Sequence, residues 1–205
     1  MFDSPRHILY IGGNHGQELD ALLTQNASTL ESITYIEAIP EICERLQAKL
    51  ESYATKTSVK LRAICALVSD MDGDEVPFYL SSNEGQSSSM FQPNPDCWVW
   101  DWVSFSGSIT LKTVTIDTLI QQGILDGAHD TLALDVQGSE LKVLKGLISI
   151  LPVIQQIQCE FSKKEFYKGG VLLPELHEFL SEAGFEIVAM EQAEHGDMYL
   201  RRARD

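Results

Sequence analysis

Acidic and glycine-rich segments follow short apolar runs in this sequence, an arrangement that places polar groups at the ends of sheet strands. Gly12, Gly13 and Gly16 follow the apolar run at residues 7–11 and precede a helical pattern. Glycine lets the backbone adopt a positive φ or approach a bound molecule with no Cβ in between. The spacing differs from the G-x-G-x-x-G fingerprint, which disfavours a nicotinamide oxidoreductase, and no P-loop Lys-Ser/Thr follows. A plain tight turn between a strand and a helix is the alternative.

Glu37 ends the second apolar run, at residues 32–37. A carboxylate at such a strand end can accept both hydroxyls of a ribose. A solvated surface glutamate is the alternative for this residue taken alone. The glycine-rich turn and Glu37 support each other, because one adenosine-containing ligand would need both.

Two further acids end apolar runs later in the chain. Asp135 closes the run at residues 131–135, and Glu160 lies at the end of the run at 153–161. Carboxylates at adjacent strand ends suit proton transfer or a divalent cation. We take Asp135 as the first candidate for a catalytic base, Glu160 as the second and His15 as the third. A helix-capping role for Asp135 and a loop-capping role for His15 are the alternatives.

Strand and helix patterns alternate along the chain, which predicts a mostly parallel sheet with helices on both faces. The main strands are expected at residues 7–11, 32–37, 59–68, 109–116, 131–135 and 153–161. Helices are expected at residues 17–25, from Pro40 onward, and at 117–122, 138–151 and 174–183. Two last strands, at residues 185–190 and 197–201, are expected to form an antiparallel pair. A seven-stranded α/β sheet with that ending resembles the Rossmann-like fold of class I methyltransferases.

A length of 205 residues favours one domain spanning residues 1–205. Residues 81–108 interrupt the regular pattern as an insertion rich in Ser, Gly, Pro and Asn. This segment contains Trp98, Trp100 and Trp102, which an extended backbone would place on one face. We expect a lid or platform for an acceptor molecule there, with packing inside the domain or a homodimer contact as alternatives.

The charge balance excludes some partners. Thirty acidic and 15 basic side chains give a formal charge of −15, which disfavours nucleic acid and anionic membrane surfaces as partners. No apolar run is long enough to cross a membrane. The cysteines form no C-x-x-C pair, so we expect Cys43, Cys65 and Cys159 to be buried thiols in a reducing cytoplasm.

Six motifs, in order, resemble the FkbM family of S-adenosylmethionine-dependent methyltransferases. The first is Y-I-G-G-N-H-G, where the family has an acid followed by I-G-A-N-x-G. The most distinctive is L-A-L-D-V-Q-G-S-E-L-K-V-L-K-G, similar to the family's L-K-x-D-V-E-G-x-E-x-x-V-L-K-G. The motifs lie at residues 10–16, 37–40, 66–73, 87–90, 114–117 and 132–146. The resemblance covers residues 8–190.

The resemblance implies S-adenosylmethionine as cofactor and S-adenosylhomocysteine as product. It also implies transfer of the methyl group to a hydroxyl of a small molecule or glycan, such as a sugar or secondary metabolite. A divalent metal is a further possibility that the motifs leave open. The implied cofactor contacts are Gly12, Gly13, Asn14, Gly16, Gln17, Glu37, Ala38, Ile39, Ser69, Asp70 and Asp135.

Two residues depart from the family pattern. Tyr10 replaces the acid of the first motif, which removes one expected contact to the methionine end of the cofactor. Gln137 replaces the glutamate of D-V-E-G, which removes a negative charge. A non-catalytic relative that binds the cofactor or acts as a scaffold is therefore the alternative to an enzyme.

Overall fold

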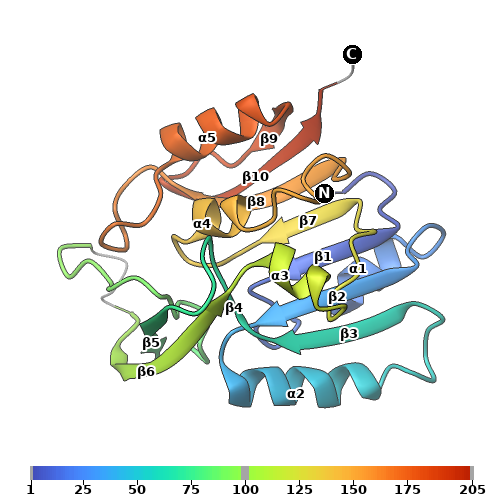
Figure 1. The fold of residues 1–205 in the computed structure, drawn as a ribbon, viewed down its shortest axis with the longest axis horizontal. Helices are drawn as coiled ribbons and strands as arrows, with labels where there is room; N and C mark the ends of the chain where they lie inside the picture. Colours follow the sequence, from blue (N-terminus) through green and yellow to red (C-terminus); the bar gives the residue numbers. More distant parts are fainter. Residues whose placement is uncertain (1, 98–101, 204–205) are drawn as a thin grey trace.

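A computed structural model describes residues 2–97 and 102–203. Within them the strands are β1 (His7–Ile11), β2 (Ser32–Glu37), β3 (Lys60–Cys65), β4 (Leu67–Val68), β5 (Glu75–Ser81), β6 (Phe105–Val114), β7 (Thr131–Leu134), β8 (Gln156–Ser162), β9 (Phe185–Met190) and β10 (His195–Arg202). The helices are α1 (Leu19–Gln25), α2 (Pro40–Glu51), α3 (Ile116–Gln121), α4 (Glu140–Lys145) and α5 (Leu173–Glu182). Seven strands form the main sheet in the order β3-β2-β1-β7-β8-β10-β9 (Figure 1).

The register of the central strands brings the predicted site residues to one edge. In the parallel pairings, Ile11 of β1 lies opposite Ile36 of β2 and opposite Leu134 of β7. The chain continues from these three positions into Gly12, Glu37 and Asp135, which therefore emerge side by side at the carboxyl ends of their strands. Ligands bind at this edge in open parallel sheets.

The C-terminal strands confirm the predicted antiparallel ending. β10 runs antiparallel to both β8 and β9, its neighbours in the sheet. This pairing places Asp197 opposite Glu160 and His195 opposite Ser162. β10, the last strand in the chain, thus lies beside the end of β8 that carries Glu160.

Side-chain alternation along the strands divides the core between two faces of the sheet. Ile8 of β1 packs in one cluster with buried leucines of α1 and α2. Its neighbour Leu9 faces the other way, into a larger cluster with buried residues of α3, α4 and α5. Because both faces are covered, strands such as β7 are buried along their whole length, as expected for parallel strands.

A second, three-stranded sheet in the order β4-β6-β5 was not predicted. The expected strand at 59–68 divides at Ala66 into β3, which stays in the main sheet, and β4, which pairs with β6. β6 begins inside the predicted insertion of residues 81–108. Trp98 and Trp100 lie outside the described residues, and Trp102 is 85% exposed, so the role of the tryptophans stays a prediction.

The expected helix at 138–151 is shorter than predicted. α4 ends at Lys145, and Ile148, which the expected helix includes, lies beyond it and is 50% exposed. Gly146 is the C-cap of α4, and a Cβ there would lie 2.1 Å from the carbonyl oxygen of Ser69, so the chain passes close to the end of β4 at this point.

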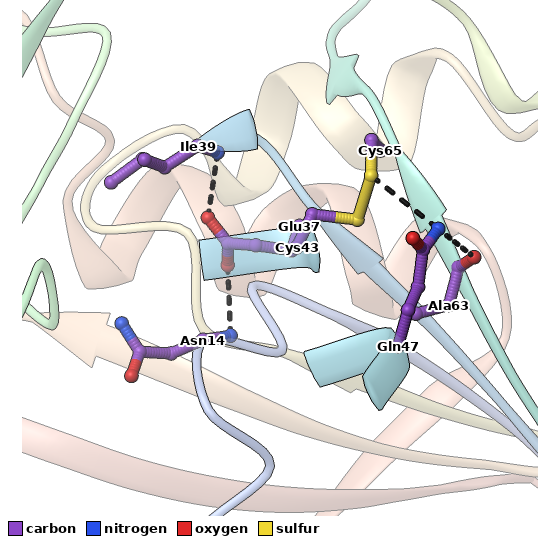
Figure 2. The surroundings of a disulfide bond; sticks show 7 residues. All are labelled: Asn14, Glu37, Ile39, Cys43, Gln47, Ala63 and Cys65. Carbon is purple, nitrogen blue, oxygen red and sulfur yellow. Dashed lines mark hydrogen bonds between the residues drawn. A yellow bond between two sulfur atoms is a disulfide. The ribbon is translucent and has the colours of Figure 1, made fainter. Parts of the chain in front are cut away.

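The prediction that Cys43 and Cys65 are buried thiols is wrong. The two form a disulfide between the first turn of α2 and the last residue of β3, with their Cα atoms 5.6 Å apart (Figure 2). Cys43 is buried and Cys65 is exposed. Cys159 is a buried free thiol, as predicted. The expectation of a reducing cytoplasm rested on these cysteines being free thiols, and the disulfide removes that support. In the described part of the chain, no helix is long and apolar enough to cross a membrane.

Candidate active site

A cavity of about 280 Å³ opens at the carboxyl ends of β1, β2 and β7. Its walls come from the loop after β1, the start of α2, residues 66–68, the insertion, and residues 135–139. Seven of the predicted cofactor contacts line it: Gly12, Asn14, Gln17, Glu37, Ala38, Ile39 and Asp135. The register of the three strands is thus sufficient to gather most of the predicted site.

Close contacts with neighbouring segments of the protein largely explain why the turn after β1 is rich in glycine. Gly12 has a φ of +88°, and a Cβ there would lie 1.7 Å from the carbonyl oxygen of Asp135. A Cβ at Gly13 would lie 2.8 Å from the Tyr35 ring, and one at Gly16 would lie 2.9 Å from Leu46. Gly12 alone of these glycines borders the cavity. Gly12 therefore allows the end of β1 to pack closely against the end of β7, and it is the point at which the backbone of this turn borders the cavity.

Glu37 connects the two segments that an adenosine would touch. Its Oε2 accepts the backbone N–H of Asn14 and its Oε1 accepts that of Ile39, each at 2.8 Å (Figure 2). The side chain is buried. Burial raises the pKa of this carboxyl, and the backbone donors oppose the rise by favouring the charged form. Each oxygen keeps a second lone pair for a ligand hydroxyl.

Asn14 fixes the turn in place. It adopts a φ of +40°, and its Oδ1 accepts the His15 backbone N–H and the side-chain N–H of Gln17. Its Nδ2 donates to the carbonyl of Glu84, in the insertion. The side chain of His15 does not border the cavity among the described residues, although its carbonyl accepts the Lys49 ammonium. His15 as a base stays a prediction without direct support from this geometry.

Ser69 and Asp70 lie beside the cavity rather than along it. Asp70 forms an ion pair with Lys142 of α4 at 2.9 Å and accepts the Ser69 hydroxyl at 3.0 Å. These bonds lower the pKa of Asp70 against the opposing effect of burial. The wall expected from Ser69 and Asp70 is formed instead by residues 66–68, with Phe78 of β5.

Gln137 holds the two acidic strand ends together. Its side-chain nitrogen donates to Asp135 Oδ1 at 2.6 Å and to Glu160 Oε2 at 2.8 Å. Its amide oxygen accepts the Tyr167 hydroxyl at 2.7 Å, and its backbone has a φ of +53°. The amide donates one hydrogen to each carboxylate, which a glutamate at this position could not do.

Asp135 and Glu160 occupy different places in this group. Asp135 borders the cavity, whereas Glu160 lies behind Gln137. Burial raises the pKa of Asp135, and burial together with the Asp135 charge raises that of Glu160. Asp135 is not a helix cap, because the carboxylate of Glu140 turns back to accept the N–H groups of Val136 and Gly138.

Further titratable residues, which the sequence did not single out, surround these acids. His195 Nε2 lies 3.0 Å from Glu160 Oε1, and burial lowers the pKa of His195. The charge of Asp197 also raises the pKa of Glu160, and burial raises the pKa of Glu140 to about 8. Among the described residues, no three His, Cys, Asp or Glu side chains are arranged to hold a metal ion.

Comparison with known proteins agrees with this fold. The profile of the methyltransferase FkbM domain matches residues 11–187. The chain is 29% identical over 152 residues to 2-O-methyltransferase NoeI of Sinorhizobium fredii, a match that covers 71% of this chain and 61% of NoeI. The match thus spans about three-fifths of that relative.

Solved structures show the same fold. An FkbM methyltransferase from Methylobacillus flagellatus superposes with a TM-score of 0.64 at 14% identity, covering 98% of this chain and 44% of that one. A putative tRNA methyltransferase of Streptococcus pneumoniae, solved with S-adenosyl-L-methionine, gives 0.51 at 12% identity, covering 97% and 66%. The family match extends over most of the sequence, so the chain belongs to the FkbM methyltransferase family.

Proposed function

We propose that the chain transfers a methyl group from S-adenosylmethionine to a hydroxyl of a small molecule or glycan. One observation supports this most strongly. One cavity has apolar walls and the buried carboxylate of Glu37, which suit an adenosine, at one end, and the half-buried carboxylate of Asp135 at the other. The two ends match the two halves of the reaction, binding of the donor and removal of a proton from the acceptor.

The residues present fit the donor. Ala38, Ile39, Leu67 and Phe78 provide apolar surface of the kind that covers an adenine ring. Glu37 offers an anchored carboxylate for the two ribose hydroxyls. We expect Gly12, Asn14 and the other predicted contacts that border the cavity to bind the remainder of the molecule.

The bound donor supplies an activated methyl group, so the chain has to orient the donor and the acceptor, exclude water from the site and supply a base. Asp135 accepts its Gln137 bond through Oδ1. Among the described residues Oδ2 has no hydrogen-bond partner, and it is left to take the proton of an acceptor hydroxyl. Burial raises the pKa of Asp135, which makes it a stronger base than an ordinary aspartate. Next to this group, burial raises the pKa of Glu160, and His195 Nε2 lies 3.0 Å from Glu160 Oε1.

Two observations support a hydroxyl acceptor outside nucleic acid. The curated relative is named as a 2-O-methyltransferase. The formal charge of −15 opposes binding to phosphate backbones. From the insertion, the exposed side chain of Gln86 and the buried Ser88 line the cavity and offer polar groups to such an acceptor.

Calorimetry followed by an activity assay tests the proposal. We expect the purified chain to bind S-adenosylhomocysteine and to transfer a labelled methyl group from S-adenosylmethionine to a member of a panel of sugars, glycans and hydroxylated metabolites. Absence of binding would contradict the proposal. Binding without transfer to any acceptor would favour the non-catalytic alternative that Tyr10 and Gln137 suggest.

A further inference from the structure

Glu18 borders the cavity with an unsatisfied buried oxygen. The residue lies between the glycine-rich turn and α1, and lines the cavity beside Gln17 and Tyr10. Its Oε1 is buried and completes no hydrogen bond among the described residues. A buried carboxylate oxygen without a donor costs free energy. Such an atom at the wall of a cavity indicates that its donor arrives with a ligand.

The neighbours of Glu18 do not neutralise it. Lys49 favours its charged form, but the Lys49 ammonium is bound to the carbonyls of His15 and Gly16 at 3.0 and 2.5 Å. The Tyr35 hydroxyl also favours the ionised carboxylate, yet this hydroxyl completes no hydrogen bond of good geometry in the described chain. Burial is the largest influence and raises the pKa of Glu18. A cation entering the cavity would reverse that rise.

The other acidic side chains of the cavity, and Tyr10, are less suited than Glu18 to bind a cation. Tyr10 is a phenol whose pKa is raised by burial and by the charge of Glu18, so it is neutral and cannot balance a cation. Glu37 is bonded through both oxygens to backbone N–H groups. Asp135 is bonded to Gln137. Among the described residues, Glu18 is thus the cavity carboxylate that has a buried oxygen without a hydrogen-bond partner.

We propose that Glu18 binds the ammonium group at the amino-acid end of the methyl donor. An ammonium has three N–H donors and no acceptor, which complements an unpaired carboxylate oxygen. This assignment gives each acid of the cavity a different role, with Glu37 binding the ribose, Glu18 the ammonium and Asp135 the acceptor proton. The inference rests on the proposed function, because it assumes this donor.

Three nucleosides that differ only beyond the sulfur atom test the assignment. S-adenosylhomocysteine carries the ammonium and the carboxylate, its decarboxylated amine carries the ammonium alone, and 5′-methylthioadenosine carries neither. In Glu18→Gln we expect affinity for the first two to fall about ten- to fiftyfold, the range of a lost charge-assisted hydrogen bond. Affinity for 5′-methylthioadenosine should stay within about twofold of that of the unmodified chain, which also reports that the variant is folded.

The matched control is Asp20→Asn, which removes a nearby exposed carboxylate in the first turn of α1. It should leave all three affinities unchanged. Equal weakening for all three nucleosides in Glu18→Gln, or unchanged affinity for S-adenosylhomocysteine, would overturn the assignment. An unmodified chain that binds 5′-methylthioadenosine but discriminates against both amines would also overturn it. A chain that binds none of the nucleosides would overturn the proposed function itself.

Discussion

His195 Nε2 and Glu160 Oε1 lie 3.0 Å apart, on two antiparallel strands that the fold brings together from distant parts of the sequence. The other ring nitrogen of His195 lies 2.9 Å from the Ser162 hydroxyl, so the imidazole is oriented on both sides. The other oxygen of Glu160 accepts from Gln137. A continuous polar network thus connects the partly exposed imidazole of His195, through Glu160 and Gln137, to Asp135, the carboxylate that borders the cavity.

His195→Asn should move the acidic limb of the pH–rate profile to higher pH. The positive form of His195 lowers the pKa of Asp135, opposing the rise that burial causes, and the lowered pKa of His195 limits this form to the acidic side of the ordinary histidine titration. Without the imidazole, Asp135 should lose its proton later as pH increases, by up to about one pH unit. Methyl-transfer rates measured between about pH 5.5 and 9 check this, a range that spans the titration of histidine. His177→Asn, an exposed histidine of α5, is the control, and identical profiles for His195→Asn and the unmodified chain would contradict the coupling.

Asp135→Asn should lower kcat by about 10²- to 10⁴-fold, the usual contribution of a general base. The amide keeps the size of the side chain, so affinity for S-adenosylhomocysteine and the thermal midpoint should change little. Steady-state kinetics, calorimetry and thermal unfolding separate these effects. A variant with near-normal kcat would remove Asp135 from the proposed role.

Glu37→Gln should weaken binding of S-adenosylhomocysteine by about tenfold or more, because a charged acceptor becomes neutral. Gln retains one acceptor for the N–H of Asn14 or Ile39, so the variant should remain folded. Calorimetry measures the affinity. Glu41→Gln, an exposed acid of the first turn of α2, should bind normally. Equal affinities in the two variants would argue against ribose binding by Glu37.

Glu140 should make the protein less stable as pH rises. Its pKa in the fold is about 8, above the ordinary value of 4.5. The folded state therefore holds this proton more tightly than the unfolded chain. The free energy of unfolding should fall by about 1.4 kcal/mol per pH unit between about pH 6 and 8 from this group alone.

Glu140→Gln should flatten that dependence, because the amide oxygen still accepts the N–H groups of Val136 and Gly138 but carries no proton to lose. Denaturant unfolding at several pH values across this range measures the slope in both proteins. Parallel slopes would show that Glu140 does not titrate in this range.

The Cys43–Cys65 disulfide should contribute about 3 kcal/mol to stability, the chain-entropy value for a loop of this length. Dithiothreitol should therefore lower the thermal midpoint of the unmodified chain. The double variant Cys43→Ser/Cys65→Ser should start lower and show no response to the reductant. A midpoint that dithiothreitol leaves unchanged would indicate that the two sulfurs are not bonded in solution.

Local patterns were sufficient to predict much of the main sheet. β1 and β2 begin and end where their apolar runs do, and strands that are neighbours in a parallel sheet bring their end residues together. It could therefore be predicted from their positions alone that Glu37 and Asp135 lie close together, and both line the cavity.

The remaining features depend on contacts between distant segments. Cys43 and Cys65 meet because α2 packs along β3, a geometry that spacing does not encode. The pairing of His195 with Glu160 depends on the antiparallel register of β10. Glu18 follows the glycine-rich turn with no pattern of its own, and only its burial at the cavity distinguishes it.

The insertion forms hydrogen bonds with both sides of the cavity, the turn after β1 and the segment after β7. Asn14 reaches the carbonyl of Glu84 at 3.0 Å, and the hydroxyl of Ser89 reaches the carbonyl of Gln137 at 2.7 Å. A molecule that orders this segment from one side lowers the entropic cost of ordering it from the other. Donor and acceptor should therefore raise each other's affinity by one shared factor, since linkage is reciprocal. Cooperativity of this kind would hold the donor more firmly when a partner for its methyl group is present.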